Sequence, residues 1–286
     1  MSDPTPNPTL VQAADGTTLA TRVVQGDGNL VVVLHGFSGD GSAMLPLADA
    51  STNGRPALIL DLIGHGASDA PSFVEPYAMS SVVDQVLSLI GPHEPGSVHL
   101  IGYSMGGRIA LSMAARAPWY FASVTTISAS AGIDDPIDRA ERHDADHVRA
   151  DHIERIGVPL FIDEWLELPL FASYVASLDD QSLSATIEQR CRNSATGLAN
   201  SLRGTGAGAM PPLWQQLSSL RSPLLAIAGE RDERYVALAE RMAQLAPFGQ
   251  VSVVANAGHV THAENLNEVS TIVRSFLKVC DQHADH

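Results

Sequence analysis

Ser104 lies in a short segment whose residue types and spacing could make a serine a nucleophile or a base. The segment Gly102-Tyr103-Ser104-Met105-Gly106 matches G-x-S-x-G, with an apolar run before it and a helix-compatible run after it. In this pattern a strand turns sharply into a helix and holds the serine at the tip in a strained backbone conformation. The helix N-terminus favours negative charge at the serine oxygen. The pattern therefore predicts a reactive oxygen at Ser104.

A base and an acid that could activate Ser104 follow later in the chain. A serine hydroxyl needs a base to accept its proton, and the base needs an acid to orient it. On a strand-to-helix turn of this kind the partners follow in the order Ser, Asp or Glu, His. Asp232 and His259 each come just after an apolar run typical of a buried strand, at the edge where open sheets place their sites. We predict a triad of Ser104, Asp232 and His259, with Glu230 as the alternative acid.

Two backbone N–H groups could stabilise an anion beside Ser104. His35-Gly36-Phe37 follows the first central apolar run, where chains with this serine turn supply one such donor, and the residue after the serine supplies the other. We predict that the N–H groups of Phe37 and Met105 form an oxyanion hole. The alternative is that His35-Gly36 is a plain strand-ending turn. His65 is expected to hold its own loop in place.

Arg108 is four residues after Ser104, one helical turn further on the same face. Helical side chains lean towards the helix N-terminus, so this guanidinium can reach back towards the serine. A simple esterase has no need of a cation there. A guanidinium fork that binds a carboxylate through two hydrogen bonds predicts an acidic substrate. The alternative is a surface arginine paired with an acidic residue.

The apolar runs predict the elements that position these residues. Continuous apolar runs are typical of strands covered on both faces of a sheet, and here they alternate with helical periodicity. This order predicts an α/β protein with a mostly parallel, doubly wound sheet. The predicted strands are 30–34, 57–62, 98–102, 124–128, 223–229 and 250–254, the predicted helices are 78–90, 105–115, 233–245 and 265–278, and 10–24 is a predicted hairpin.

A stretch with a different pattern interrupts this alternation. From about Asp134 to Met210 the chain has no buried-strand pattern and is rich in Asp, Glu and Arg. Helical runs are predicted near 138–155, 160–177 and 179–203. We interpret 134–210 as a helical cap inserted into a core domain that is formed by residues 1–133 and 211–286.

Composition and charge limit the partners and the compartment. The chain has 17 basic and 32 acidic residues and a net charge of −15, which argues against nucleic acid or an anionic membrane as the main partner. An acidic substrate is still compatible, because a few arginines can make one pocket positive. The two cysteines form neither a disulfide framework nor a zinc pattern. With no secretory signal at the N-terminus and no membrane-length apolar stretch, we expect a soluble, cytoplasmic protein.

Two weaker patterns do not lead us to expect a metal or a cofactor. Histidines and aspartates crowd the segment 143–152, but a solvated helix face explains them better than a metal site, because no H-E-x-x-H or C-x-x-C motif supports one. The run Gly204-Thr205-Gly206-Ala207-Gly208 imitates a dinucleotide loop. No strand precedes that run and two prolines follow it, so we reject that interpretation.

Four segments resemble one particular family. They are Gly102–Arg108, then Leu198–Gly206 with its Gly-Thr-Gly, then Leu213-Trp214, and Gly229–Tyr235. The chain resembles the α/β-hydrolase superfamily over nearly its whole length, and most closely the 2-succinyl-6-hydroxy-2,4-cyclohexadiene-1-carboxylate (SHCHC) synthases of menaquinone biosynthesis. The resemblance implies a lyase that removes a proton from its substrate and expels pyruvate to leave a cyclohexadiene.

The resemblance also implies roles for individual residues. Ser104, activated by His259 and Asp232, would be the base, and the oxyanion hole would stabilise charge on a conjugated carboxylate. The substrate is a small polycarboxylate, which accounts for Arg108. The further substrate-binding residues implied are His35, Tyr103, Arg142, Trp165 and Arg190. The Asp134-Asp135-Pro136 entry and the acidic, His-rich run 141–152 depart from the basic-leaning cap that the resemblance implies, which weakens the match at Arg142.

Two other functions remain open at this point. The first is a serine hydrolase (an esterase, a thioesterase or a C–C bond hydrolase) that uses the same triad. The second is a scaffold of the same fold that only binds a ligand, although such a module has no need of an activated serine. A monomer is expected, with a homodimer as the alternative.

Overall fold

A mostly parallel sheet forms the centre of the computed structural model, which describes residues 7–284. The first six residues, part of the segment in which we expect no secretory signal, lie outside the described residues. The strand order is β1-β2-β4-β3-β5-β6-β7-β8, with β2 antiparallel to both neighbours and the other pairs parallel. The strands are β1 (Thr9–Gln12), β2 (Thr18–Val24), β3 (Leu30–Leu34), β4 (Ala57–Leu60), β5 (Val98–Tyr103), β6 (Phe121–Ile127), β7 (Leu224–Gly229) and β8 (Gly249–Val254).

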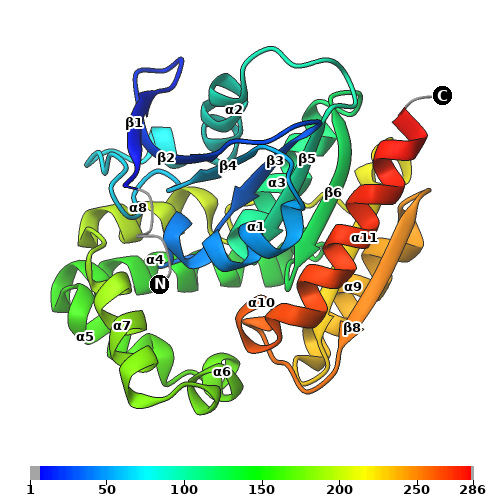
Figure 1. Cartoon of the computed structure of the whole chain (residues 1–286). Helices are drawn as coiled ribbons and strands as arrows, with labels where there is room; N and C mark the ends of the chain where they lie inside the picture. The colour runs from blue at the N-terminus through cyan, green and yellow to red at the C-terminus, as the bar shows by residue number, and fades with distance from the viewer. Residues whose placement is uncertain (1–6, 285–286) are drawn as a thin grey trace.

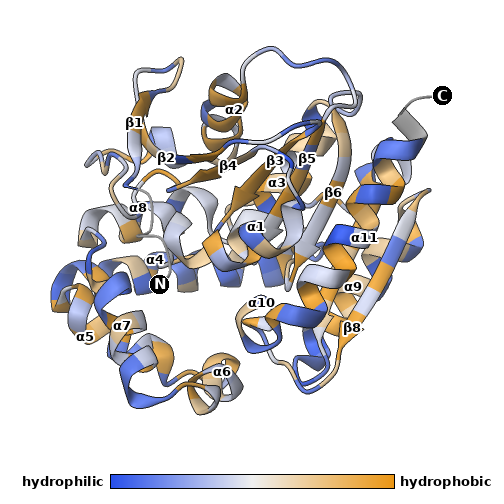
Figure 2. Ribbon diagram, in the orientation of Figure 1, coloured by the Kyte–Doolittle hydropathy of each residue, from blue (hydrophilic) through white to orange (hydrophobic). Residues whose placement is uncertain are grey.

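Helices cover both faces of this sheet, which confirms the predicted fold class. Helices α1 (Leu45–Thr52) and α11 (Leu266–Ala284) lie on the near face in Figure 1, and α2 (Met79–Ile90), α3 (Met105–Arg116) and α9 (Glu233–Leu245) lie on the far face. Successive side chains of a strand point to opposite faces, so Val31 and Val33 pack with α1 and α11, and Val32 and Leu34 pack with α2 and α3. Figure 2 shows β3 and β4 in orange and α11 striped orange and blue.

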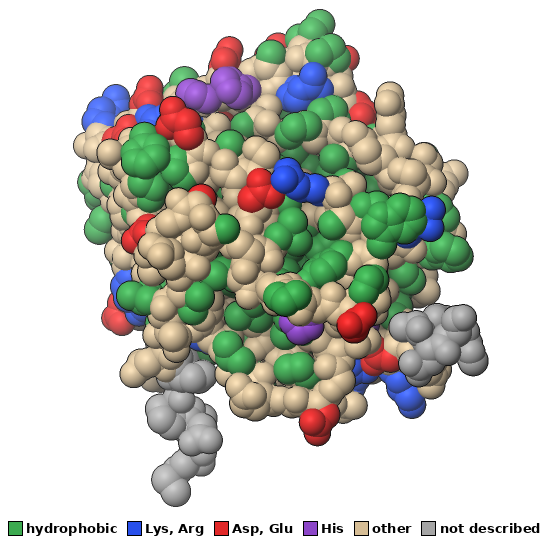
Figure 3. All heavy atoms as spheres, turned by 90° about the horizontal axis from the view of Figure 1, so that it is seen from above, with side chains coloured by type: hydrophobic (Ala, Val, Ile, Leu, Met, Phe, Trp, Pro, Cys, Tyr) green, Lys and Arg blue, Asp and Glu red, His purple; other side chains and the backbone are tan. Residues whose placement is uncertain are grey.

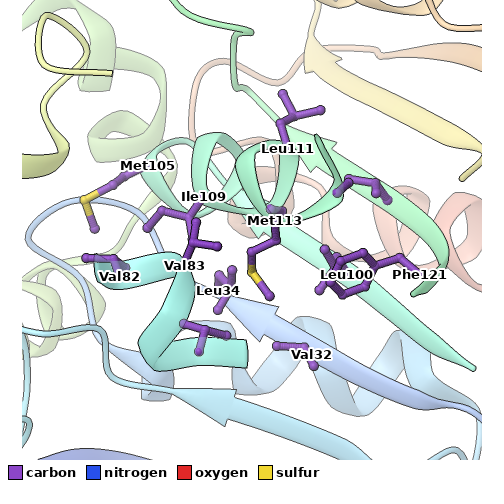
Figure 4. Packing of buried hydrophobic residues seen from close by; sticks show 14 of the residues in the cluster. Val32, Leu34, Val82, Val83, Leu100, Met105, Ile109, Leu111, Met113 and Phe121 are labelled. Carbon is purple, nitrogen blue, oxygen red and sulfur yellow. The ribbon is translucent and has the colours of Figure 1, made fainter. Parts of the chain in front are cut away.

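Each face of the sheet carries a hydrophobic core, and α3, the helix that follows Ser104, packs into the larger of the two. Ile109 and Met113 of α3 point towards Leu34 of β3 and Val83 of α2 (Figure 4). All four side chains are at most 2% exposed. Burying one such side chain stabilises a fold by about 1.5–3 kcal/mol. The turn at Ser104 is therefore held on both sides by rigid, buried elements.

Helices occupy most of the chain from Pro136 to Thr205, between β6 and β7. They are α4 (Pro136–Ile156), α5 (Val158–Leu166), α6 (Ala172–Ser177), α7 (Asp180–Cys191) and α8 (Ala195–Thr205), with the 3-10 helix η3 (Pro169–Phe171). Figure 1 shows them together at the lower left, and we refer to residues 134–210 as the cap. The prediction of single helical runs at 160–177 and 179–203 was wrong. The first run breaks before Pro169, and the second breaks where Ser194 caps α8 by accepting the N–H of Gly197 at 3.3 Å.

Acidic and basic side chains are intermixed on the described surface. On the face drawn in Figure 3, lysine and arginine side chains of the described residues lie singly between acidic and uncharged ones. Among residues 7–284, none of the helices combines the length and the apolarity that crossing a bilayer requires.

Replacing Gly106 by alanine tests the packing of the Ser104 turn. A Cβ at this position would lie 2.3 Å from the carbonyl oxygen of Leu34, so backbone would have to move. We expect Gly106→Ala to lower the free energy of unfolding by about 2 kcal/mol or more, measured by urea denaturation. Ser112→Ala, in the same helix, is the control and should change it by less than about 0.5 kcal/mol. Equal stability of the two variants would contradict this packing.

Candidate active site

Ser104 sits at the junction of β5 and α3 in the conformation that the sequence predicts. Its φ of 50° and ψ of −107° lie outside the usual regions for a residue with a side chain. The serine N–H donates to Ile127 at 2.8 Å, and its carbonyl accepts the N–H of Arg108 at 3.1 Å. A Cβ on Gly102 would lie 2.3 Å from the carbonyl oxygen of Gly106. The backbone strain at Ser104 is thus imposed by its neighbours.

The structure brings Ser104, His259 and Asp232 together in a hydrogen-bonded series. His259 Nε2 lies 3.2 Å from Ser104 Oγ, and His259 Nδ1 lies 2.7 Å from Asp232 Oδ2. The carboxylate accepts the Nδ1 proton and leaves Nε2 free to accept the serine proton. Glu230, the alternative acid, instead accepts the backbone N–H of Asn256 at 2.9 Å. That bond joins the loops after β7 and β8, which carry the acid and the base.

The backbone N–H groups of Phe37 and Met105 flank the serine. Met105 is the first residue of α3, so its N–H has no acceptor within the helix. Among the described residues, the N–H of Phe37 has no hydrogen-bond acceptor, and Phe37, Ser104 and Met105 line the same cavity. These two donors could hold an anion beside Ser104 Oγ.

His35 does not reach this cavity, contrary to the expected role in substrate binding. Its Nε2 accepts the N–H of Leu62 at 2.9 Å, and its Nδ1 donates to the carbonyl of Gly36 at 2.8 Å. The ring is 1% exposed, and burial lowers its pKa, which keeps it neutral. Because both ring nitrogens bind backbone, His35 supports the turn that carries Phe37. His65 is also buried, as expected for a loop-holding residue, with Nδ1 3.1 Å from the carbonyl of Ile63.

A cavity of about 320 Å³ opens in front of Ser104 between core and cap. The described residues place four arginines in its walls and one carboxylate, that of Asp232, which is bonded to His259. The cavity is thus positive although the chain carries a net charge of −15. The four arginines are Arg108, Arg142, Arg190 and Arg234; the sequence predicts the first three for the site and does not single out the fourth.

The three predicted arginines differ in how far protein groups already bind them. Arg108 Nη2 donates to the carbonyl of Thr205 at 2.9 Å, and its buried Nε has no partner among the described residues. Burial lowers the pKa of Arg108. Arg190 donates to Ser38 Oγ at 2.5 Å and also has an unpartnered Nε. Arg142 is bound at Nε by Asp146 at 2.8 Å. Of the three, Arg108 is closest to Ser104 in sequence, and its Nε could donate a hydrogen bond to a ligand.

Aromatic side chains form another wall of the cavity. The Trp165 ring centroid lies 5.4 Å from that of Phe37 and 5.5 Å from that of Phe171, within the range of aromatic pairing. Tyr235 is not among the residues predicted for the site, and its ring centroid is 4.6 Å from that of His259. Tyr235 comes three residues after Asp232, the N-cap of α9, and this short spacing was the available signal.

Tyr103 is buried beside the triad, next to His262. The ring centroids are 5.6 Å apart for Tyr103 and His259, and 4.5 Å apart for Tyr103 and His262. Burial raises the pKa of Tyr103 and keeps its hydroxyl protonated. A Cβ on Gly36 would lie 2.6 Å from this ring, so the glycine lets the Phe37 turn approach the serine.

The His-rich part of α4 forms ordinary surface contacts. The rings of His143 and His147 lie 4.2 Å apart between centroids, and His152 pairs with Glu164 at 2.7 Å. Within residues 7–284, no group of three or more His, Cys, Asp or Glu side chains is arranged to hold a metal ion.

The chain is similar in sequence to proteins of a known family. The chain belongs to the α/β hydrolase fold family, whose sequence profile matches residues 29–266. A Bacillus subtilis (strain 168) protein provisionally named 2-succinyl-6-hydroxy-2,4-cyclohexadiene-1-carboxylate synthase is 34% identical over 86% of this chain and 89% of its own length. The synthase of that name from Salmonella heidelberg (strain SL476) is 31% identical over 82% of this chain and 88% of its own. Within the fold family, the chain thus belongs to the SHCHC synthase family.

Solved structures show the same relationship. The structure of MenH from S. aureus superposes with a TM-score of 0.84 at 31% identity, covering 91% of this chain and 98% of that one. An enol-lactonase from Burkholderia xenovorans LB400 superposes with a TM-score of 0.79 over 94% of this chain and 100% of that one, at 22% identity, and shows the fold alone.

Buried histidines predict a dependence of stability on pH. Burial lowers the pKa of both His65 and His262 to about 3, and in an unfolded chain it is about 6.5. The unfolded state therefore binds more protons as pH falls from 6.5 towards 3, and the free energy of unfolding decreases. Each histidine contributes a slope of at most about 1.4 kcal/mol per pH unit.

Urea denaturation between pH 7.5 and pH 4.5 measures this slope. We expect His65→Gln to reduce the slope by the share of one histidine, whatever it does to the stability at pH 7.5. His93→Gln, at an exposed position, is the control and should leave the slope unchanged. A wild-type slope in His65→Gln would contradict a neutral, buried His65.

Proposed function

We propose that the chain eliminates pyruvate from 2-succinyl-5-enolpyruvyl-6-hydroxy-3-cyclohexene-1-carboxylate to give SHCHC, a step of menaquinone biosynthesis. One observation carries the proposal: the Ser104–His259–Asp232 series faces a cavity with four arginines and no free carboxylate among its described walls. Such a cavity suits a substrate that carries several carboxylates. The names of the similar proteins from B. subtilis and Salmonella support the same activity.

The triad supplies the base. Ser104 Oγ removes a proton from the substrate ring and passes its own proton to His259 Nε2, which lies 3.2 Å away. The electron pair of the broken C–H bond forms the C2=C3 double bond, the ring π bond shifts from C3=C4 to C4=C5, and the C–O bond between C5 and the enolpyruvyl group breaks. Asp232, 2.7 Å from His259 Nδ1, stabilises the protonated ring while the leaving group departs as the enolate of pyruvate. The proton held by His259 then converts this enolate to pyruvate and returns the ring to its neutral form.

The oxyanion hole and the arginines act on the charge of the substrate. The N–H groups of Phe37 and Met105 meet the negative charge that grows on the succinyl carbonyl oxygen, which is conjugated with the carbon that loses the proton, and this favours the transition state over the bound substrate. Arg108 holds a carboxylate next to the reacting carbon through its unused donors. Arg190 and Arg142 bind the other end of the substrate together with Trp165, and Tyr103 packs beside the serine.

The same hydrogen-bonded triad favours a second candidate function, a serine hydrolase. In that reaction Ser104 would attack a carbonyl and the oxyanion hole would bind a tetrahedral intermediate. Four arginines in the cavity wall would serve no purpose for a neutral ester. The two functions therefore differ in what they require of Arg108.

Pyruvate release tests the triad. The unstable substrate is generated in situ by the enzyme that makes it, and pyruvate is followed with lactate dehydrogenase and NADH. We expect Ser104→Ala and His259→Ala each to lose at least about 10³-fold in kcat, because the base is removed or left without a proton acceptor. Near-normal release by either variant would exclude this assignment.

Replacing Arg108 separates the lyase from the hydrolase. A charged hydrogen bond contributes about 1.5–3 kcal/mol, so Arg108→Met should lower kcat/KM for pyruvate release by about 10–100-fold. Hydrolysis of a neutral nitrophenyl ester should stay at background in both proteins. Arg116→Met is the matched control, since Arg116 lies in the same helix, is 52% exposed and pairs with Asp84. Ester turnover that needs Ser104 but not Arg108, without pyruvate release, would establish the hydrolase.

A further inference from the structure

Glu264 holds the backbone on both sides of the triad histidine. It ends the short helix α10 (Thr261–Glu264), five residues after His259. Its Oε2 accepts the N–H of Gly258 at 2.9 Å, and its Oε1 accepts the N–H of Val260 at 3.1 Å. The two oxygens of one carboxylate thus hold the backbone N–H groups of the residues before and after His259, and with them the direction in which its ring leaves the loop.

The same carboxylate also binds the cap. Ser173, in α6, donates its hydroxyl to Glu264 Oε2 at 2.6 Å, across 91 residues of sequence. Ser173 lies so close to the loop that a Cβ on Gly258 would be 2.1 Å from its Oγ. The neighbouring Phe171 places its ring edge-on to that of His259, 6.2 Å between centroids. Residues 171–173 are therefore the part of the cap that rests on the histidine loop.

The charge of Glu264 is met by hydrogen bonds alone. Across the described chain, its carboxylate forms no ion pair with Lys, Arg or His, and it accepts hydrogen bonds from two backbone N–H groups and the Ser173 hydroxyl. Hydrogen bonds to an ionised carboxylate are about twice as strong as neutral ones. Oε2 is shared between Gly258 and Ser173, so a change in the position of α6 changes the bonding of the loop directly.

We propose that Glu264 is a positioning residue that makes the placement of His259 depend on the seating of the cap. When α6 is seated, Ser173 completes the hydrogen bonds of the carboxylate, and the histidine loop takes the geometry in which Nε2 faces Ser104. When α6 moves away, the carboxylate is left with the loop alone and can turn towards water. His259 is then in place to accept the proton of Ser104 only while the cap covers the substrate. This inference rests on the proposed function for its rate measurement.

Three variants of the full-length chain test it. Glu264→Gln replaces one acceptor oxygen by a donor, so one loop N–H loses its partner. Ser173→Ala removes the cap hydroxyl, and Ser173→Thr keeps one. Ser177→Ala is the control, because Ser177 lies in the same helix, is exposed and binds only the carbonyl of Tyr174. Urea denaturation identifies any variant that fails to fold.

The measurements are kcat and KM for pyruvate release. We expect Glu264→Gln to lower kcat about 10-fold or more and Ser173→Ala to lower it about 3–10-fold, both with KM within threefold of wild type. Ser173→Thr should restore at least half of the wild-type kcat. In the Glu264→Gln background, Ser173→Ala should have no further effect, because the hydroxyl acts through that carboxylate. Additive losses, or a fall in stability with unchanged kcat, would overturn the proposal.

A second readout does not depend on the proposed reaction. A small neutral fluorophosphonate labels an activated serine, and its rate of reaction with Ser104 reports how well His259 is placed. We expect the rates of the variants to follow the order of their kcat values. If Ser104 is labelled faster in the wild type than in Glu264→Gln and Ser173→Ala, but the wild type releases no pyruvate, the proposed function fails and the positioning role stands. If labelling rates are equal in wild type, Glu264→Gln and Ser173→Ala, the positioning role fails, whatever the pyruvate assay shows.

Discussion

The close contact between the backbone of α3 and the end of β3 is the constraint on which the site depends. At Gly106 the helix meets the carbonyl of Leu34 with no room for a side chain. This contact sets the sharp exit of the chain from β5, and so the unusual φ of Ser104. It also places the first N–H of α3 beside the turn that follows Leu34, which carries Phe37. The reactive oxygen and both proposed anion donors thus derive their geometry from one backbone approach.

The cavity is lined by positive charge, although the chain as a whole is negatively charged. A net charge of −15 repels a polyanion, but salt largely screens this repulsion at separations beyond about 10 Å. Inside the cavity the substrate would meet arginines at short distance, in a region that water reaches less easily. Leaving donors such as Arg108 Nε without a protein partner is unfavourable in the empty protein. A bound carboxylate would offset that cost, so the arrangement favours the charged ligand.

Most of the framework was predictable because its signals are local. Runs such as Leu30–Leu34 are apolar on both faces, and the glycines around Ser104 reveal a turn within five residues. The misassigned features depend on contacts distant in sequence. The partner of His35 Nε2 is the N–H of Leu62, 27 residues away, so sequence alone could not show that this ring faces away from the cavity. The same holds for Glu264, whose cap partner is 91 residues distant. Pro169 is a signal for the break in the sequence itself, but the apolar periodicity on both sides of it favoured one continuous helix.

The insertion of the cap as one uninterrupted stretch has a consequence for how such proteins diversify. The proposed triad and the proposed donors of the oxyanion hole all lie outside 134–210, whereas the proposed substrate-binding residues Arg142, Trp165 and Arg190 lie within it. A single recombination event that exchanges this stretch would replace much of the recognition surface and leave the reactive groups intact. New substrate preferences can therefore arise in this architecture as a change of one contiguous gene segment, limited by whether the incoming stretch can still meet the carboxylate of Glu264.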